Sequence, residues 1–345
     1  MNIKGIMKHI FYACASYSTL PRVLHQISMR HSLGVLMYHG IVEEPLAVPD
    51  WCFITAQEFK RQMEYLQKSV RVVSLRQAVK ELVAGSIHRP TIALTFDDGY
   101  QNNHDVALPI LRNLGLPATV FLVTGLVGSD DTLWFCRLNQ ALAATRRQSL
   151  SWNGNELCLR TQYDRARISA LLQRLLKTLP HDDMLMSVGE ILVQLGADPR
   201  EPIQSASPYR MLDTQAIQTM AESGLIEFGA HTASHVILSR ERNRERIRRE
   251  IIDSIRETER LTGLPCKTFA YPNGSPQDYG PDDVQLLEQM GVDVAVTTIS
   301  GPNMRDTSVL ELRRYGVGVD CTDSEFQCLV HHFDAKRILR IGRGS

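Results

Sequence analysis

Short apolar runs that alternate with helix-patterned segments dominate this sequence of 345 residues. The clearest runs, at residues 33–38, 91–96 and 118–123, are apolar throughout rather than at every second position. A strand has this pattern when both of its faces are buried, as in a parallel sheet covered by helices. The alternation therefore predicts an α/β fold with a mostly parallel sheet, either open or closed into a barrel.

Further strands are predicted at residues 70–75, 225–229, 268–271 and 292–297. The alternation of strands and helices is interrupted between about 127 and 207. Only helical patterns recur there, around 137–145, 163–178 and 184–195. No pair of strands is evident there. We therefore predict a helical insertion at about 127–207 within an α/β domain of residues 33–345.

Composition excludes some classes of protein. The 38 basic and 38 acidic residues give zero net charge, so we expect no nucleic-acid partner. The seven cysteines are scattered, odd in number and free of C-x-x-C pairs. This usage is typical of reduced thiols in a cytoplasmic protein, and it argues against a cysteine-rich zinc site.

An N-terminal arm of residues 1–32 is the exception to this neutral balance. The first 42 residues contain Lys4, Lys8, Arg22 and Arg30 and no acidic residue. The arm is either a solvated helix or a basic, partly apolar segment that rests on an anionic membrane surface. We expect a cytoplasmic protein, which contacts the inner membrane peripherally if the arm is of the second kind. Secretion is less favoured, because the apolar run at 10–15 is short for a signal peptide.

Four polar clusters each follow the end of a predicted strand. They begin with His39, with Asp97 and Asp98, with His231 and with the loop 272–274. In parallel α/β folds, the ligand site is built from the loops at the carboxyl ends of the strands. The clusters are therefore expected to meet at one edge of the sheet.

A histidine pair points to a metal at this edge. His231 and His235 are four residues apart, which puts both imidazoles on one side of a helical turn. Together with a carboxylate from the pair at 97–98, they suit zinc or another divalent metal. The alternative is that one histidine caps or packs and the other is exposed.

The segments 95–99 (TFDDG) and 231–235 (HTASH) resemble the first two motifs of the polysaccharide deacetylases, carbohydrate esterase family 4. The resemblance extends from about residue 33 to 319. The segments 36–39 (LMYH) and 269–274 (FAYPNG) are similar to a subgroup that includes biofilm and exopolysaccharide de-N-acetylases.

This resemblance implies a distorted (β/α) barrel of about seven parallel strands with a bound divalent metal. Zinc is the expected ion, with cobalt or nickel as alternatives. By motif position, Asp97 would be the general base, and Asp98, His231 and His235 would bind the metal. These roles suit hydrolysis of an acetamide, which needs a polarised carbonyl and an activated water.

Two family features are missing from their usual places. The third motif has no arginine here, and Arg314 is the candidate for the cation that orients the base. The backbone N–H of Asn273 is the candidate for the oxyanion hole. The general acid is His39 if the motif is permuted to the N-terminus, or His331 in the segment Leu329-Val330-His331.

The predicted function is removal of N-acetyl groups from the sugars of a cell-surface polysaccharide or its lipid-linked precursor. The expected partner is accordingly an N-acetylated glycan or glycolipid. Two alternatives are hydrolysis of a cyclic amide on the same barrel and an inactive glycan-binding module. Trp134 and the insertion either shape a substrate cleft or form a buried anchor.

Overall fold

The computed structural model of this chain describes residue 12 and residues 31–333. The predicted arm lies outside the described residues except for Tyr12, His31 and Ser32, so the location and membrane contact inferred from it stay predictions. None of the described helices is long and apolar enough to cross a lipid bilayer.

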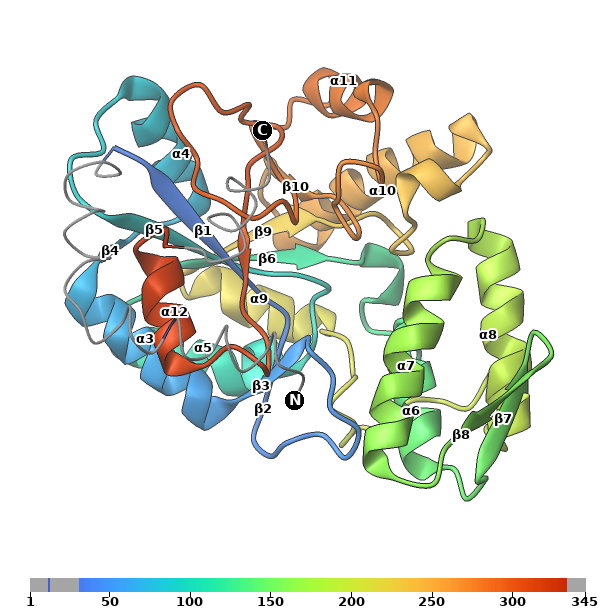
Figure 1. Cartoon of the computed structure of the whole chain (residues 1–345). Helices are drawn as coiled ribbons and strands as arrows, with labels where there is room; N and C mark the ends of the chain where they lie inside the picture. The colour runs from blue at the N-terminus through green and yellow to red at the C-terminus, as the bar shows by residue number, and fades with distance from the viewer. Residues whose placement is uncertain (1–11, 13–30, 334–345) are drawn as a thin grey trace, which may run out of the picture.

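One eight-stranded sheet forms the centre of the described part of the chain, and all of its strand pairs are parallel (Figure 1). Seven strands follow the order β11-β10-β9-β6-β5-β1-β12, and β4 pairs with β5 beside them. The strands are β1 (Leu33–Tyr38), β4 (Arg71–Val72), β5 (Thr91–Phe96), β6 (Ala118–Leu122), β9 (Ile226–Ala230), β10 (Thr268–Ala270), β11 (Val294–Val296) and β12 (Tyr315–Gly316). The predicted distorted (β/α) barrel of about seven parallel strands is confirmed.

The barrel is distorted where its two ends meet. Between β11 and β12, the described residues form only an isolated bridge from Val296 to Leu312 rather than a continuous ladder. Next to β12 in the sheet, β1 and β5 pair along their whole length, and every residue of both strands is buried. Burial on both faces is the reason that these two strands are apolar throughout.

Helices cover the outside of the curled sheet. They are α3 (Ala56–Ser69), α4 (Leu75–Ala84), α5 (Leu108–Leu114), α9 (Thr214–Glu222), α10 (Arg244–Thr262), α11 (Pro281–Gln289) and α12 (Asp323–Val330). Short elements complete the described barrel: β2 (Gly40–Val42), β3 (Phe53–Thr55), η2 (Asn103–Ala107), η3 (Thr124–Leu126) and η4 (Leu238–Arg240).

Local side chains set the bounds of these helices. α10 buries Ile247, Ile251 and Ile255 on one stripe, and it begins after Asn243, whose side chain caps its first turn. The strand predicted at 70–75 is shorter than expected. Ser74 caps α4, so the chain turns into a helix at the next residue.

The segment 127–207 forms a separate body beside the barrel (Figure 1). It contains α6 (Trp134–Ala144), α7 (Gln162–Leu176) and α8 (His181–Leu195), which pack around a shared apolar cluster that includes Leu138, Leu172 and Ile191.

The same segment also contains a β-hairpin that the sequence analysis missed. β7 (Ser149–Trp152) and β8 (Asn155–Cys158) pair in antiparallel fashion, so the expectation of no strand pair was wrong. Asn153 and Gly154 join the two strands with φ values of 49° and 73°. Asn-Gly is a preferred dipeptide for such a two-residue turn, and it was the signal in the sequence.

Candidate metal and catalytic site

Side chains from four strand ends line one cavity, which we call the site cavity. His39 follows β1, Asp97 and Asp98 follow β5, and His231 follows β9. Asn273 lies three residues beyond Ala270, the last residue of β10. The other lining residues are Met37, Trp51, Cys52, Phe135, Gln173, Lys177, His235 and Thr298. The clusters that follow separate strands in the sequence therefore meet at one edge of the sheet.

Asp98, His231 and His235 form a compact group of metal-ligand atoms. Oδ1 of Asp98 lies 3.4 Å from Nε2 of His235 and 3.6 Å from Nε2 of His231. One ligand atom from each residue lies within 4.8 Å of the other two. Nδ1 of His231 makes a hydrogen bond of 2.7 Å with the carbonyl of Ala270, which leaves its Nε2 facing the group.

The polar atoms of this group fit a divalent cation. Both carboxylate oxygens of Asp98 are buried and have no hydrogen-bond partner among the described residues, although buried polar atoms normally have one. Burial and then the charge of Asp97 raise the pKa of Asp98 to about 8. Burial lowers the pKa of His235 and His231. Neutral imidazoles are metal ligands, and a cation would compensate for the buried carboxylate.

Asp97 is bound by a cation of the chain itself. Arg314 donates from Nη1 to Oδ1 at 2.6 Å and from Nη2 to Oδ2 at 2.7 Å. Its remaining bonds go to the carbonyl of Thr297 and the hydroxyl of Thr95, at 2.8 and 3.1 Å. Burial alone would raise the pKa of Asp97, but the Arg314 charge outweighs it and the pKa is lowered to about 2. Arg314 thus lies against the carboxylate that the family arginine was expected to orient.

Backbone strain is concentrated at the site cavity. Six non-glycine residues of the described chain have positive φ, and four of them lie in its loops. These four are Asp98 (75°), Thr232 (63°), His235 (57°) and Asn273 (61°). Such conformations cost about 1–3 kcal/mol each and persist where packing enforces them. Their position is a mark of function that does not depend on the motif letters.

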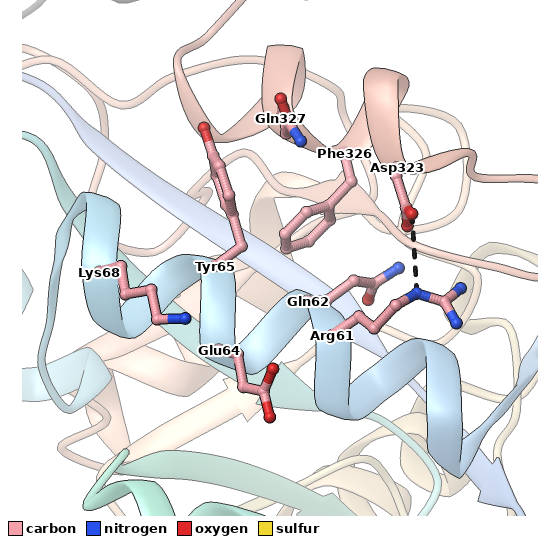
Figure 2. A pocket seen from close by; sticks show the side chains of 8 residues that line it. All are labelled: Arg61, Gln62, Glu64, Tyr65, Lys68, Asp323, Phe326 and Gln327. Atoms are coloured by element: carbon pink, nitrogen blue, oxygen red, sulfur yellow. Dashed lines mark ion pairs between the residues drawn. The ribbon is translucent and has the colours of Figure 1, made fainter.

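The two candidates for the general acid lie in different places. His39 lines the site cavity. His331 follows α12, and its Nε2 makes a hydrogen bond of 3.1 Å with the hydroxyl of Tyr65 on α3. Tyr65 lines a separate hollow between α3 and α12, which the ion pair of Arg61 with Asp323 spans (Figure 2). The geometry therefore favours His39.

Burial lowers the pKa of His39 to about 4, although the nearby charge of Asp97 opposes this shift. Nδ1 of His39 is buried and has no hydrogen-bond partner among the described residues. The imidazole is therefore neutral at pH 7 in the protein alone, and one ring nitrogen is free to contact a ligand.

Asn273 lines the site cavity, and its side chain and carbonyl are both hydrogen-bonded elsewhere. Its side chain donates to Asp278 at 2.6 Å, and its carbonyl accepts from the hydroxyl of Thr298 at 2.7 Å. Its backbone N–H makes no hydrogen bond within the described residues. A fixed, free N–H of this kind can bind an oxyanion.

Seven of the lining residues were not among the predicted site residues, and three of these, Trp51, Gln173 and Lys177, offer an exposed ring or long polar side chains. Trp51 lies beside His39, with ring centroids 4.9 Å apart, and is 44% exposed. Gln173 and Lys177 come from α7 and its end, so the insertion contributes to the cavity. Trp134, the residue singled out instead, is only 9% exposed and packs against its neighbour in the insertion. No local pattern distinguishes these roles.

Comparison with known proteins now adds to this geometry. The family model described as polysaccharide deacetylase matches residues 84–295, which include both motifs. Poly-beta-1,6-N-acetyl-D-glucosamine N-deacetylase from Staphylococcus epidermidis is 34% identical over 79 residues, which are 23% of this chain and 27% of that protein. The match thus spans about a quarter of the length of that relative.

Solved structures share the fold. The deacetylase PplD of Streptococcus pyogenes, in complex with acetate, has a TM-score of 0.57 at 17% identity, covering 88% of this chain and 98% of that one. IcaB from Ammonifex degensii has a TM-score of 0.55 at 21% identity, covering 88% and 97%. The family model covers more than half of the sequence, which confirms the resemblance. This chain therefore belongs to the polysaccharide deacetylase family.

Proposed function

We propose that this protein is a metal-dependent hydrolase that removes N-acetyl groups from the sugars of an exopolysaccharide. One observation carries the proposal. A buried Asp-His-His group with unpartnered carboxylate oxygens lies directly beside a second aspartate that an arginine holds ionised. An amide hydrolase of this family needs these two functions in one cavity.

Asp98, His231 and His235 would hold the ion. When bound, a divalent ion supplies Lewis acidity, which polarises an acetyl carbonyl and makes water more acidic. Neighbouring residues hold the two histidine ligands in position. His231 is fixed by its bond to the Ala270 carbonyl, and His235 packs edge to face against Phe135, with centroids 5.6 Å apart.

Asp97 is the proposed general base. Each of its carboxylate oxygens accepts one bond from Arg314 and retains further lone pairs that can accept a proton from water. The low pKa keeps the carboxylate ionised at neutral pH, but it also makes Asp97 a weaker base than an aspartate in water. Its contribution therefore depends on orientation, which the two-point contact with Arg314 enforces.

The acyl oxygen becomes negatively charged when water adds to the acetamide. The free backbone N–H of Asn273 is the proposed donor to that oxygen. His39 is the proposed donor of a proton to the leaving amine. Because its imidazole is neutral at pH 7 in the protein alone, it must gain a proton in the substrate complex before it can act as an acid.

The rim of the cavity supports a sugar as substrate. The exposed ring of Trp51 offers an apolar face of the kind on which a sugar ring packs. The named relative from Staphylococcus epidermidis acts, according to its name, on poly-beta-1,6-N-acetyl-D-glucosamine. We propose the same class of substrate for this chain, as the finished polymer or as its lipid-linked precursor.

Acetate release tests this function. The purified protein is assayed on poly-N-acetylglucosamine, chitin oligomers and a lipid-linked N-acetyl sugar, with detergent present for the last. We expect release from at least one of them, loss of release with a chelator, and recovery with zinc or cobalt. Cyclic amides serve as the comparison substrates. Release that a chelator leaves intact, or hydrolysis of cyclic amides alone, would contradict the proposal.

A further inference from the structure

A second small cavity adjoins the site cavity. It lies between the end of α7, the start of α8 and η4, and it shares His235 and Lys177 with the site cavity. Its lining residues are Trp134, Leu176, Lys177, Leu179, His181, Met184, His235, Ile237 and Arg240. No acidic residue is among them, while Lys177 and Arg240 are basic.

Neither basic side chain has a salt-bridge partner in the described part of the chain, although the charge of Lys177 also acts on Asp50 and Asp98. The ammonium of Lys177 and the guanidinium of Arg240 make no ion pair or side-chain hydrogen bond with a described residue. Nε of Arg240 is buried and unpartnered. Both residues are half-buried. A cation that is partly removed from water without a partner costs free energy, which an anion at the same place would recover.

Arg246 on α10 is half-buried like Arg240, but its guanidinium has two ion-pair partners. It binds Asp182 at 2.8 Å and Glu241 at 3.2 Å. Asp182 and Glu241 are therefore both paired with Arg246. Arg240 makes no ion pair with a described residue, although Glu241 is its neighbour in the sequence, and its Nε is buried.

Lys177 adjoins the candidate metal site, because it lines the site cavity together with Asp98, His231 and His235. A group bound to Lys177 would therefore lie close to the reacting atoms, on the side of His235 that faces the insertion.

We propose that Lys177 and Arg240 form an anion subsite that binds a phosphate or carboxylate group of the same substrate whose acetamide reaches the metal site. This inference rests on the proposed function. It narrows the substrate to an N-acetylated sugar that carries an anionic group, and it therefore disfavours the neutral finished polymer. A phosphate would come from a lipid-linked or phosphodiester-linked sugar, and a carboxylate from a uronic acid. The insertion, through Lys177, then selects the substrate.

Binding to the zinc-loaded protein tests the subsite without requiring turnover. Three probes are compared by calorimetry: methyl N-acetylglucosaminide, N-acetylglucosamine 1-phosphate and the corresponding N-acetylated uronic acid. We expect at least one charged probe to bind about 10-fold or more tightly than the neutral one. The probe with the larger preference identifies phosphate or carboxylate as the source of the anion.

Variants locate the effect. Lys177→Gln and Arg240→Gln should each remove about 10-fold of this preference, whereas Lys177→Arg should keep most of it. Arg174→Gln on α7 and Arg242→Gln after η4 are matched controls, because both residues are exposed and line neither cavity. They should leave the preference unchanged. Zinc content and thermal unfolding of each variant establish that the fold and the metal site persist.

A charged probe held by the metal alone would bind equally well to Lys177→Gln, and that result would overturn the subsite. Equal binding of all three probes to the unaltered protein would overturn it as well. A preference that Lys177→Gln removes, in a protein that releases acetate neither from the probes nor from the polymeric and lipid-linked substrates tested above, would support the subsite and contradict the proposed deacetylation.

Discussion

Asp97 and Asp98 have different surroundings in the site cavity. Arg314 donates two hydrogen bonds to the carboxylate of Asp97, whereas the carboxylate oxygens of Asp98 have no hydrogen-bond partner in the described chain. The two residues are adjacent in sequence and both are buried. Nevertheless, the pKa of Asp97 is lowered to about 2 by Arg314 against the effect of burial, and that of Asp98 is raised to about 8 by burial and by Asp97.

The backbone separates these two environments. Asp97 continues from β5 and donates its N–H to the Tyr38 carbonyl at 2.9 Å. Asp98 adopts a positive φ of 75°, and its carboxylate lies close to His231 and His235 rather than to Arg314. Neighbouring carboxylates are thereby assigned to different partners, one to a cation of the chain and one to an ion from outside.

The largest effect is expected from exchanging each aspartate for its amide. Asp98→Asn should lose both the metal and all turnover, because it removes the charged ligand. Asp97→Asn should keep the metal and lose about 10²–10⁴-fold in kcat, the usual contribution of a general base. Metal content by mass spectrometry and acetate release measure the two outcomes. Full activity of Asp97→Asn would exclude Asp97 as the general base. Loss of metal in that variant would show that Asp97, like Asp98, is needed for metal binding.

The same test applies to the two candidates for the general acid, with His331 as the control outside the site cavity. His39→Gln should lower kcat by about 10²–10⁴-fold with the metal retained, because His39 lines the site cavity. His331→Gln should leave kcat unchanged, because His331 is bonded to Tyr65 instead. Steady-state acetate release measures both. The opposite ranking would move the general acid to the L-x-H segment.

In the metal-free protein, replacing Asp97 should lower the free energy of unfolding more than replacing Asp98 does. Asp97→Asn leaves the buried Arg314 without a counterion and should cost about 3–5 kcal/mol in the free energy of unfolding. Asp98→Asn should change this free energy little, since Asp98 is neutral at pH 7 without a metal. Urea unfolding in the presence of a chelator measures both. A larger loss for Asp98→Asn would reverse the comparison.

The sign of the pH effect on the Asp97 pair follows from its lowered pKa. Its stabilisation is complete above the pKa of an unfolded aspartate, about 4, and is lost as the pH falls from there through about 2.

The smallest effect is a pH dependence of metal affinity. Below about pH 8, Asp98 of the metal-free protein carries a proton that metal binding must release. Affinity should therefore rise about tenfold per pH unit up to about pH 8 and then level off. His231 and His235 should add no further proton release at neutral pH, because burial lowers the pKa of both. Competition with a chromophoric chelator from pH 6 to 9 measures the slope, and a flat profile would show that Asp98 is already ionised.

Part of the fold was predictable because its signals are local. The strands at 33–38 and 91–96 appear at the predicted positions, since each run is apolar over its whole length. The β7–β8 hairpin was missed although the Asn153-Gly154 turn was visible in the sequence. The short β12 could not be predicted, because two residues that complete a sheet edge have no pattern of their own.

For the site, the sequence by itself determined the chemistry of the ligand groups. The Asp-Asp-Gly turn and the His-x-x-x-His spacing are short-range features, and the structure brings Asp98, His231 and His235 within reach of one ion. The positions of these groups after buried strands were sufficient to place them at one edge of a parallel sheet.

Only the tertiary structure decided which distant residues complete the cavity. Arg314 meets Asp97 from 217 positions away, His39 and not His331 faces the site, and Trp51 and Lys177 lie on its rim. Periodicity and turn preferences depend on a few neighbouring residues, whereas these contacts depend on how the barrel curls and where the insertion packs against it. The charges that set the two aspartates apart therefore come from the fold rather than from their place in the sequence.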